Sequence, residues 1–298
     1  MTKVLVTGGS GFFGHGIMKA FAANGFDVVG TTTKSNGEHL IECDIVDSDA
    51  VKRAVDDNDP DIIIHSAALS SVTSGKPIDY YTVNVVGTEN VLRAASSRKR
   101  RVVLVSTAGV YGNQTTDVLT EDLPPAPIHH YGISKFACER LAVMHGAALD
   151  ITIVRPFNII GVGQKENFIV PKLMRAFSNR DSTVRLGNTN VYRDYIDLQT
   201  ASEIMVRIAD QPRTSGQVLN LCAGHATSLD DLLSIMAIIY EYDIKVIVDP
   251  EFVRPSEVWR LIGSNRRLIE NDCWITPPDL SQVLRKMVAE QANKGASS

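Results

Sequence analysis

The most constraining feature of this sequence is a glycine-rich segment between an apolar run and an amphipathic stretch. The run Val4–Val6 leads into TGGSGFFG at Thr7–Gly14, and residues 12–24 follow with helical periodicity. Glycines after a strand permit a tight turn, and the N–H groups that open the helix can then bind a pyrophosphate. A glycine-rich turn without a ligand is the alternative. The residues expected to hold the pyrophosphate are Gly8, Gly11, Phe12, Phe13 and Gly14.

The first half of the chain alternates short β-branched runs with longer amphipathic stretches. This alternation predicts parallel strands joined by crossover helices, in an α/β fold with a doubly wound parallel sheet. We expect strands near 3–7, 27–31, 61–65, 101–106 and 151–155, and helices near 12–24, 48–57, 81–97 and 131–146. After residue 157 the pattern is mixed, with helices expected near 168–178, 199–210, 228–240 and 279–292 and strands near 183–186, 217–221 and 244–248.

Composition excludes several classes of protein. A chain of 298 residues with 44% hydrophobic residues can bury a large core. Thirty Lys and Arg against 34 Asp and Glu give a net charge of -4, which disfavours nucleic acid as a partner. The four cysteines are scattered, the N-terminus leads into a strand rather than a signal peptide, and no apolar run reaches the roughly 18 residues that span a bilayer. We therefore expect reduced, mostly buried thiols in a cytoplasmic protein without a membrane partner.

The end of the second expected strand bears on the choice between NAD and NADP. An acidic residue there would bind the ribose 2′-hydroxyl of NAD, but the sequence reads Gly30-Thr-Thr-Thr-Lys34. Hydroxyls and a lysine could instead accept a 2′-phosphate, so we expect Thr31, Thr32 and Lys34 to favour NADP over NAD. An exposed threonine-rich turn is the alternative.

A tyrosine and a lysine four residues apart suggest acid–base chemistry. Tyr131 and Lys135 lie on one face of an expected helix, and the ammonium could stabilise a tyrosine phenolate, whose ordinary pKa is about 10. Such pairs also occur on ordinary solvated helices. The hydroxyls of Ser106 and Thr107 close the fourth strand, at the edge where ligands of open α/β sheets bind.

The histidines do not indicate a metal site. His129 and His130 are adjacent, so they cannot share a helix face, and no histidine lies four residues from another. His65 lies within an apolar strand, where a buried and hydrogen-bonded core role is expected. The sequence has no Gly-x-Ser-x-Gly motif of a hydrolase.

Taken together, these residues resemble the extended short-chain dehydrogenase/reductase family, whose TGxxGFxG pattern Thr7–Gly14 matches in full. The resemblance covers nearly the whole chain. It implies a Rossmann sheet, hydride exchange between a nicotinamide and a sugar carbon, and catalysis by Thr107, Tyr131 and Lys135, with Asn84 as a structural residue. The resemblance also implies further contacts to the cofactor, from Asp44, Ile45, Ala67, Ala68, Leu69 and Phe157.

The second half resembles the branch of this family that acts on nucleotide-diphosphate sugars. Within this branch it resembles the GDP-4-keto-6-deoxymannose reductases and the related GDP-mannose dehydratases. Two arginines could bind a diphosphate and a glutamate could accept ribose hydroxyls, although surface ion pairs are the alternative for the arginines. The implied substrate contacts are Thr107, Asn158, Lys172, Arg193, Arg254 and Glu257.

One departure from the family narrows the reaction. Dehydratases of this branch carry one or two acidic residues just after the catalytic threonine, whereas this chain has Ala108-Gly109. Dehydration by the usual route is therefore disfavoured. Val162 and Ser264 also differ from the residues common at those positions, where proline and aspartate are usual.

These observations lead to one main hypothesis and two alternatives. The main one is NAD(P)H-dependent reduction of a nucleotide-diphosphate 4-keto-6-deoxyhexose, with GDP as the expected nucleotide and Tyr131 as proton donor. The alternatives are a 4-epimerase that retains NAD and a non-catalytic dinucleotide-binding regulator. We expect a cofactor domain over 1–160, to which 191–221 returns, and a nucleotide-sugar region over 161–190 and 222–298. The resemblance also implies a homodimer formed through the helices near 81–97 and 131–146.

Overall fold

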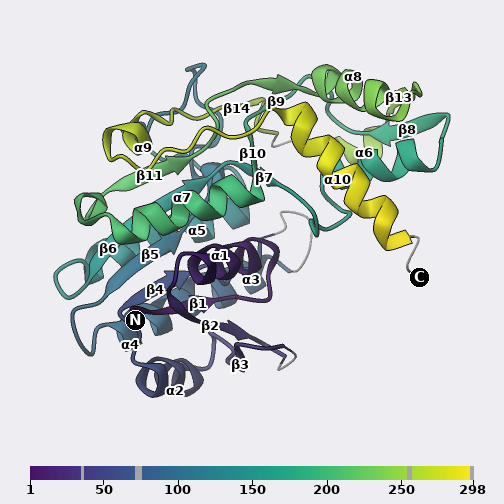
Figure 1. The fold of residues 1–298 in the computed structure, drawn as a ribbon. Helices are drawn as coiled ribbons and strands as arrows, with labels where there is room; N and C mark the ends of the chain where they lie inside the picture. Colours follow the sequence, from purple (N-terminus) through teal and green to yellow (C-terminus); the bar gives the residue numbers. More distant parts are fainter. Residues whose placement is uncertain (35–36, 71–75, 254–256, 296–298) are drawn as a thin grey trace.

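A seven-stranded parallel sheet forms the centre of the molecule (Figure 1). The computed structural model describes residues 1–34, 37–70, 76–253 and 257–295. The strands of the sheet are β1 (Lys3–Thr7), β2 (Asp27–Thr32), β3 (Leu40–Glu42), β4 (Ile62–His65), β5 (Arg101–Val105), β6 (Asp150–Pro156) and β11 (Val218–Leu221). Their order is β11-β6-β5-β4-β1-β2-β3. The chain leaves β1 for β2 on one side and returns to β4 on the other, which opens a crevice at the carboxyl ends of β1 and β4.

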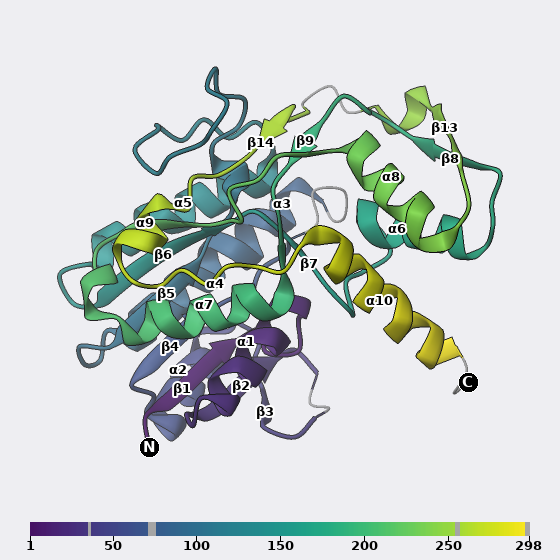
Figure 2. The same cartoon turned by 45° about the horizontal axis from the view of Figure 1, so that its top comes forward.

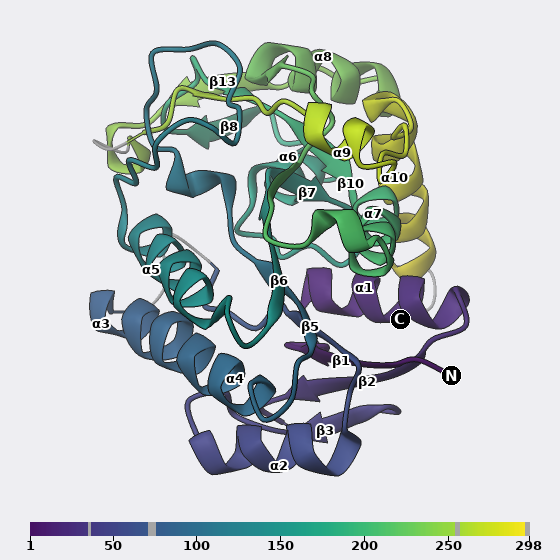
Figure 3. The same cartoon turned by 90° about the vertical axis from the view of Figure 1, so that its left-hand side faces the viewer.

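Helices cover both faces of this sheet (Figure 3). One face carries α1 (Phe12–Ala23) and α7 (Leu198–Asp210), and the other carries α2 (Ser48–Asn58), α4 (Gly87–Ala95) and α5 (His130–His145). Successive strand residues point to opposite faces. Val4 and Val6 accordingly pack in the core under α1 and α7, while Leu5 packs in the core under α2, α4 and α5. The expected doubly wound α/β fold is confirmed.

The segments after β6 that leave the main sheet build a smaller mixed region beside it (Figure 2). Its strands form three small sheets: β7 (Asn158–Ile160) with β10 (Tyr195–Asp197); β9 (Tyr192–Arg193) with β12 (Thr227–Ser228) and β14 (Arg260–Leu261); and β8 (Thr183–Leu186) with β13 (Lys245–Val248). Its helices are α6 (Ile169–Ser178), α8 (Leu229–Tyr240) and α10 (Leu280–Gly295). They share one apolar core, which includes Leu173, Leu232 and Leu284.

The remaining elements refine the expected helix boundaries. The helix expected over 81–97 begins earlier and is divided into α3 (Pro77–Tyr80), a π-helical segment η1 (Tyr81–Val86) and α4. The short elements η2 (Ala108–Val110), η3 (Pro212–Thr214), η4 (Pro250–Phe252) and α9 (Arg266–Glu270) were not expected. In the described part of the chain, no helix is both long and apolar enough to cross a membrane.

Candidate active site

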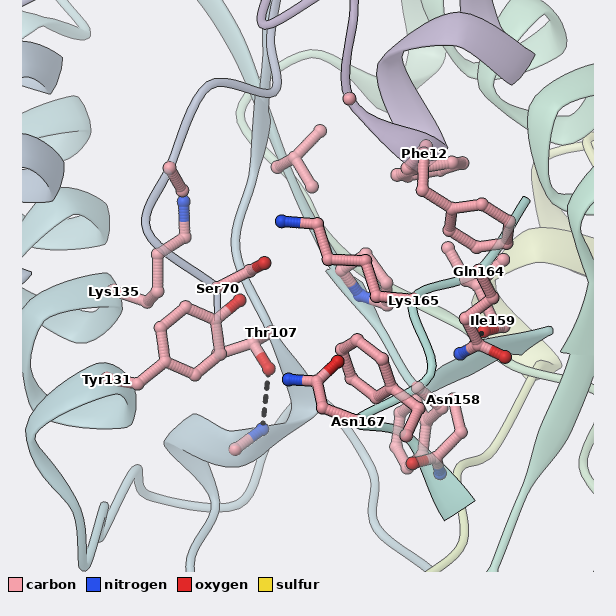
Figure 4. A pocket seen from close by; sticks show the side chains of 18 of the residues that line it. Phe12, Ser70, Thr107, Tyr131, Lys135, Asn158, Ile159, Gln164, Lys165 and Asn167 are labelled. Carbon is pink, nitrogen blue, oxygen red and sulfur yellow. Dashed lines mark hydrogen bonds between the residues drawn. The ribbon is translucent and has the colours of Figure 1, made fainter. Parts of the chain in front are cut away.

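A cavity of about 1340 Å³ runs from the start of α1, past the carboxyl ends of β4 and β5, to the smaller region. Figure 4 shows Thr107, Tyr131 and Lys135 together at this cavity, with Lys165 pointing into the same space. Most of the residues predicted from the sequence line its wall. They are Gly8, Gly11, Phe12, Phe13, Gly14, Thr31, Thr32, Asp44, Ile45, Ala67, Ala68, Thr107, Tyr131, Lys135, Phe157, Asn158, Lys172, Arg193 and Glu257.

The glycine turn is shaped to hold an anionic ligand. Gly8 has φ +71°, and a Cβ there would lie 2.8 Å from the Cα of Ala67, so only glycine fits. Helix α1 begins at Phe12 with no side-chain cap, whereas α2, α5, α7 and α8 each have one. The first N–H groups of α1 are thus left for a ligand at the positive end of the helix dipole. The residues present therefore fit the pyrophosphate of a dinucleotide.

The threonines at the end of β2 have a structural use that the sequence did not reveal. The Thr31 hydroxyl accepts a hydrogen bond from the Gly8 N–H at 3.3 Å, and the Thr32 hydroxyl accepts one from the Ser10 hydroxyl at 2.9 Å. Both therefore brace the glycine turn. Lys34 is exposed and is not among the cavity-lining residues, so its contact with a 2′-phosphate stays a prediction.

The backbone of Leu69, a predicted cofactor contact, is fixed by Asn84. Its backbone N–H donates to Asn84 Oδ1 at 2.8 Å, and its carbonyl accepts from Asn84 Nδ2 at 3.2 Å. Asn84 Nδ2 also donates to the Ser134 hydroxyl at 2.9 Å. Leu69 is thus tied to η1 and α5, and it is not among the residues that line the cavity. Asn84 lies in the π-helical segment and joins this loop to the helix that carries Tyr131.

Tyr131 and Lys135 lie in a largely dehydrated environment. Burial raises the pKa of Tyr131 to about 12, while the neighbouring Thr107 hydroxyl acts in the opposite direction. Lys135 is 2% exposed, and burial lowers the pKa of its ammonium. Helix geometry places the two side chains about 6 Å apart along the axis of α5. The free protein therefore holds a protonated phenol beside a buried lysine side chain.

Thr107, not Ser106, presents its hydroxyl to the reaction space. Ser106 donates to Glu139 Oε1 at 2.5 Å, and Glu139 also forms a two-point ion pair with Arg155, at 2.9 and 2.7 Å. Glu139 and Arg155 are nearly fully buried. The Thr107 hydroxyl accepts from the Gly109 N–H at 3.1 Å, drawn as a dashed line in Figure 4. Helix α5 and strands β5 and β6 are therefore joined directly beneath the Thr107 and Lys135 side chains.

His65 is the buried, hydrogen-bonded core residue that the sequence suggests. Its two ring nitrogens bond to the hydroxyls of Thr7 and Thr88, at 2.7 and 2.9 Å. Burial, with a smaller effect from Lys135, lowers its pKa to about 3. The ring is therefore neutral at ordinary pH and joins β4 to β1 and α4.

At the far end of the cavity, predicted substrate residues contact one another. Arg193 forms an ion pair with Glu257 at 2.8 Å, and Glu257 also accepts from Asn188 at 3.1 Å. Lys172 donates to the Arg185 carbonyl and lies 4.6 Å from the Phe252 ring centroid. Arg254, the second predicted arginine, lies outside the described residues.

Asp194 connects this end of the cavity to the main sheet. It is fully buried and accepts hydrogen bonds from the N–H groups of Ala223, Gly224 and Gly263 at 2.7, 2.9 and 3.2 Å. Burial nevertheless raises its pKa to about 6. Its own carbonyl accepts from the Asn158 side chain at 3.0 Å. One carboxylate thus fixes the loops after β11 and β14 next to the predicted substrate residues.

The cavity also contains polar residues that sequence reasoning missed. They include Ser70, Gln164, Lys165, Asn167 and Asn188, several of which are labelled in Figure 4. His129 was considered only as a metal ligand, yet it lies on the wall beside Gly109. Its position two residues before Tyr131, where the helix begins, was the available signal.

Comparison with known proteins agrees with this geometry. Residues 4–222 match the model of the NAD dependent epimerase/dehydratase family. The chain belongs to this family. It is thus an oxidoreductase-type enzyme of the extended short-chain dehydrogenase/reductase kind, as the sequence motifs predicted.

Two curated relatives and one solved structure are similar over most of their lengths. The GDP-6-deoxy-D-talose 4-dehydrogenase of Aggregatibacter actinomycetemcomitans is 34% identical, covering 90% of each chain. The GDP-6-deoxy-D-mannose reductase of Pseudomonas aeruginosa is 28% identical, covering 78% of this chain and 80% of its own. A crystal structure of a putative epimerase from Burkholderia cenocepacia J2315 is 34% identical, with a TM-score of 0.90 and 98% of each chain covered.

Proposed function

We propose that this enzyme reduces the 4-keto group of a nucleotide-diphosphate 4-keto-6-deoxyhexose, with GDP as the nucleotide. The observation that carries the proposal is that the glycine turn and the side chains of Thr107, Tyr131 and Lys135 line one cavity. Position 109 of the same wall is a glycine and so supplies no carboxyl group for dehydration. The named activities of the two curated relatives, both on GDP-6-deoxyhexoses, support the choice of substrate.

The chain's own residues divide the chemistry among them. The reduced nicotinamide, when bound, supplies the hydride. Thr107 holds the keto oxygen by a hydrogen bond, and the Tyr131 hydroxyl donates its proton to that oxygen as the carbonyl becomes an alcohol. Lys135 stabilises the phenolate that this transfer leaves behind and binds the nicotinamide ribose. Water from the open end of the cavity then returns a proton to Tyr131.

We propose a division of labour between the two parts of the chain. Residues 1–160 with 191–221 make up the cofactor domain, and residues 161–190 with 222–298 make up the nucleotide-sugar region. Thr107, Asn158 and Arg193 of the cofactor domain also contact the sugar nucleotide. The Arg193–Glu257 ion pair lies at the far end of the cavity from the glycine turn. A diphosphate would compete with Glu257 for the Arg193 guanidinium, which leaves the carboxylate for ribose hydroxyls.

The decisive experiment is an assay of NADPH oxidation with 4-keto-6-deoxy sugars that a dehydratase generates in place. GDP-, dTDP-, CDP- and UDP-linked substrates are compared side by side. We expect stoichiometric oxidation with the GDP-linked substrate. No oxidation with any of the four would refute the reductase proposal.

A nucleotide-sugar 4-epimerase is the second candidate, because the names of the family and of the similar solved structure both include the word epimerase. An epimerase uses the same threonine, tyrosine and lysine but returns the hydride to the opposite face of the sugar. It should purify with tightly bound nicotinamide and turn over without added NADPH. A reductase should release its cofactor and consume it in each cycle.

We predict that NADPH is preferred to NADH. No carboxylate stands at the end of β2 to bind a ribose 2′-hydroxyl or repel a 2′-phosphate, and exposed Thr33 and Lys34 follow. The KM for NADPH should be lower than that for NADH, and Lys34→Ala should narrow the difference. Lys19→Ala, which changes a lysine of α1, is the matched control and should have no effect. A lower KM for NADH would contradict the prediction.

The raised pKa of Tyr131, about 12, predicts different pH dependences for reduction of the ketone and oxidation of the alcohol. Reduction uses the protonated phenol, which persists below that pKa, so its kcat/KM should be nearly flat from about pH 6 to about pH 8. Oxidation of the alcohol needs the phenolate, so its kcat/KM should rise with pH over the same range. Initial rates in both directions test this. A reverse rate that falls as pH rises would contradict it.

We further propose that the protein is a homodimer that pairs through η1, α4 and α5, together with the preceding α3; these helices pack against one another (Figure 3). Ile78, Val86, Ile133, Val143 and Met144 on these helices are large apolar residues that are 40–77% exposed. Sedimentation at micromolar concentration should give the dimer mass. Met144→Lys should shift the equilibrium towards monomer, while Ile238→Lys on α8, which is 68% exposed, should not. A monomeric wild-type protein would overturn the proposal.

A further inference from the structure

One lysine on the cavity wall is unpaired. Lys165 lies in the loop of residues 161–168, which joins β7 to α6 and belongs to no helix or strand. Figure 4 shows its side chain extended into the cavity, between Phe12 on one side and Tyr131 on the other. Among the described residues, Lys165 has no side-chain hydrogen-bond or ion-pair partner. The cavity therefore contains an ammonium group that is open to a ligand.

Two consecutive turns hold the backbone on either side of Lys165. The Gln164 N–H donates to the Gly161 carbonyl at 3.3 Å. The Phe168 N–H donates to the Lys165 carbonyl at 3.2 Å. The Gln164 side chain also donates to the Ile159 carbonyl at 3.0 Å, which ties the loop to β7. The direction in which Lys165 leaves the loop is thus set by the fold.

The acidic neighbour of Lys165 faces another way. Glu166 forms an exposed ion pair with Arg175 of α6 at 3.1 Å. Both residues line a separate cavity of about 250 Å³ beside α10, and Lys165 is not part of its wall. The loop therefore presents its positive charge to the main cavity and its negative charge elsewhere.

The other cations on the described wall of the main cavity are already engaged. Arg193 forms the ion pair with Glu257 at 2.8 Å. Lys172 donates to the Arg185 carbonyl at 2.8 Å. Lys135 is buried at the proposed reaction centre. A ligand with a negative charge on each of two phosphoryl groups would need a further cation, and Lys165 is exposed and extended into the space that it would occupy.

We propose that the Lys165 ammonium binds the diphosphate of the sugar nucleotide. This inference rests on the proposed function in one respect, namely that the cavity binds a nucleotide-diphosphate sugar. The dinucleotide also carries a pyrophosphate, but the uncapped N–H groups at the start of α1 are available for that group. Loop 161–168 belongs to the proposed nucleotide-sugar region and leads directly into α6, which carries Lys172. Because Lys165 is unpaired, it can bind the diphosphate without first breaking an ion pair, unlike Arg193.

The variant Lys165→Met tests this contact, because methionine keeps a long, unbranched side chain and removes the charge. Calorimetry measures the binding of GDP and GDP-mannose, and of UDP and UDP-glucose, with the oxidised cofactor present. Whichever pair the wild type binds, the variant should bind both members about ten- to thirtyfold more weakly, the value of one hydrogen bond to a charged group. A fluorescence titration of NADPH should show an unchanged affinity.

A control variant and a salt series show whether the charge is responsible. Lys286→Met on α10 is the matched control, because Lys286 is exposed and does not line the cavity. It should change neither affinity. The difference between wild type and Lys165→Met should shrink as KCl is raised from about 0.05 M to about 0.5 M, because salt screens an exposed charge.

The outcomes distinguish this inference from the reductase proposal. Equal affinities of wild type and Lys165→Met for the nucleotide diphosphates would overturn the role of Lys165. So would a loss seen only with the sugar-bearing ligands, a loss seen only with NADPH, or a difference that salt does not change. A wild-type protein that binds none of the four nucleotides would overturn it as well. If NADPH oxidation fails but the loss of diphosphate affinity is seen, the reductase proposal falls and the role of Lys165 stands.

Discussion

Replacing Tyr131 with phenylalanine is expected to lower kcat for the proposed reduction by about a hundred- to ten-thousandfold, the usual contribution of a positioned acid or base. The substitution removes one hydroxyl and keeps the ring that packs beside His129. The helix, the glycine turn and Lys135 are unchanged, so cofactor affinity should be nearly retained. Stopped-flow measurement of hydride transfer, together with a fluorescence titration of NADPH, separates these two quantities.

Tyr81→Phe is the matched control, because the Tyr81 hydroxyl bonds to exposed His130 and Tyr81 is not among the cavity-lining residues. Its turnover should equal that of the wild type. A Tyr131→Phe protein with full activity would exclude Tyr131 as the proton donor. If the wild type and the Tyr131→Phe protein bound the dinucleotide equally well and neither turned over substrate, a dinucleotide-binding regulator would be the better description.

The second large effect concerns stability. Arg155→Leu should reduce the free energy of unfolding by about 3–5 kcal/mol, because it leaves the Glu139 carboxylate buried without its cation. Both side chains of the pair are about 95% buried, with exposed fractions of 4% for Arg155 and 5% for Glu139. Urea unfolding followed by circular dichroism measures the loss.

Two further variants show whether the loss comes from the unpaired charge. The double variant Arg155→Leu with Glu139→Leu should recover much of the stability, since it removes both charges. Arg175→Ala breaks an exposed ion pair with Glu166 and should leave stability nearly unchanged. A double variant less stable than Arg155→Leu would show that the unpaired Glu139 charge is not the source of the loss.

Local patterns were sufficient to predict the cofactor end of the site. The turn at Thr7–Gly14 and the pair Tyr131 and Lys135 are set by spacing along single elements, and the structure places all of them at one cavity. The expected strands of the main sheet were found because each holds three or more apolar or β-branched residues within a few positions. β3, with three residues between partly exposed positions, carries no such signal.

Contacts between distant segments could not be predicted in the same way. The strands β9, β12 and β14 have two residues each, too few for any periodicity, and they form only because they pair with one another. The Arg193–Glu257 ion pair joins residues 64 positions apart. Thr31 lies on the cavity wall, and its hydroxyl also braces Gly8 through a contact set by the pairing of β1 with β2, which no local pattern predicts.

The spacing of functional residues on α5 has a consequence for how the enzyme can diverge in evolution. Tyr131, Lys135 and Glu139 follow one another at intervals of four residues, so they lie along one stripe of the helix, each about 6 Å beyond the last. One inserted residue among them would rotate part of the stripe by about 100° and separate the proton donor from its cation or from the buried ion pair. This segment therefore has a fixed length. New substrate preferences must arise elsewhere, in loops such as 161–168. This loop contributes residues to the cavity wall but belongs to no helix or strand, so its length can change without shifting the register of one.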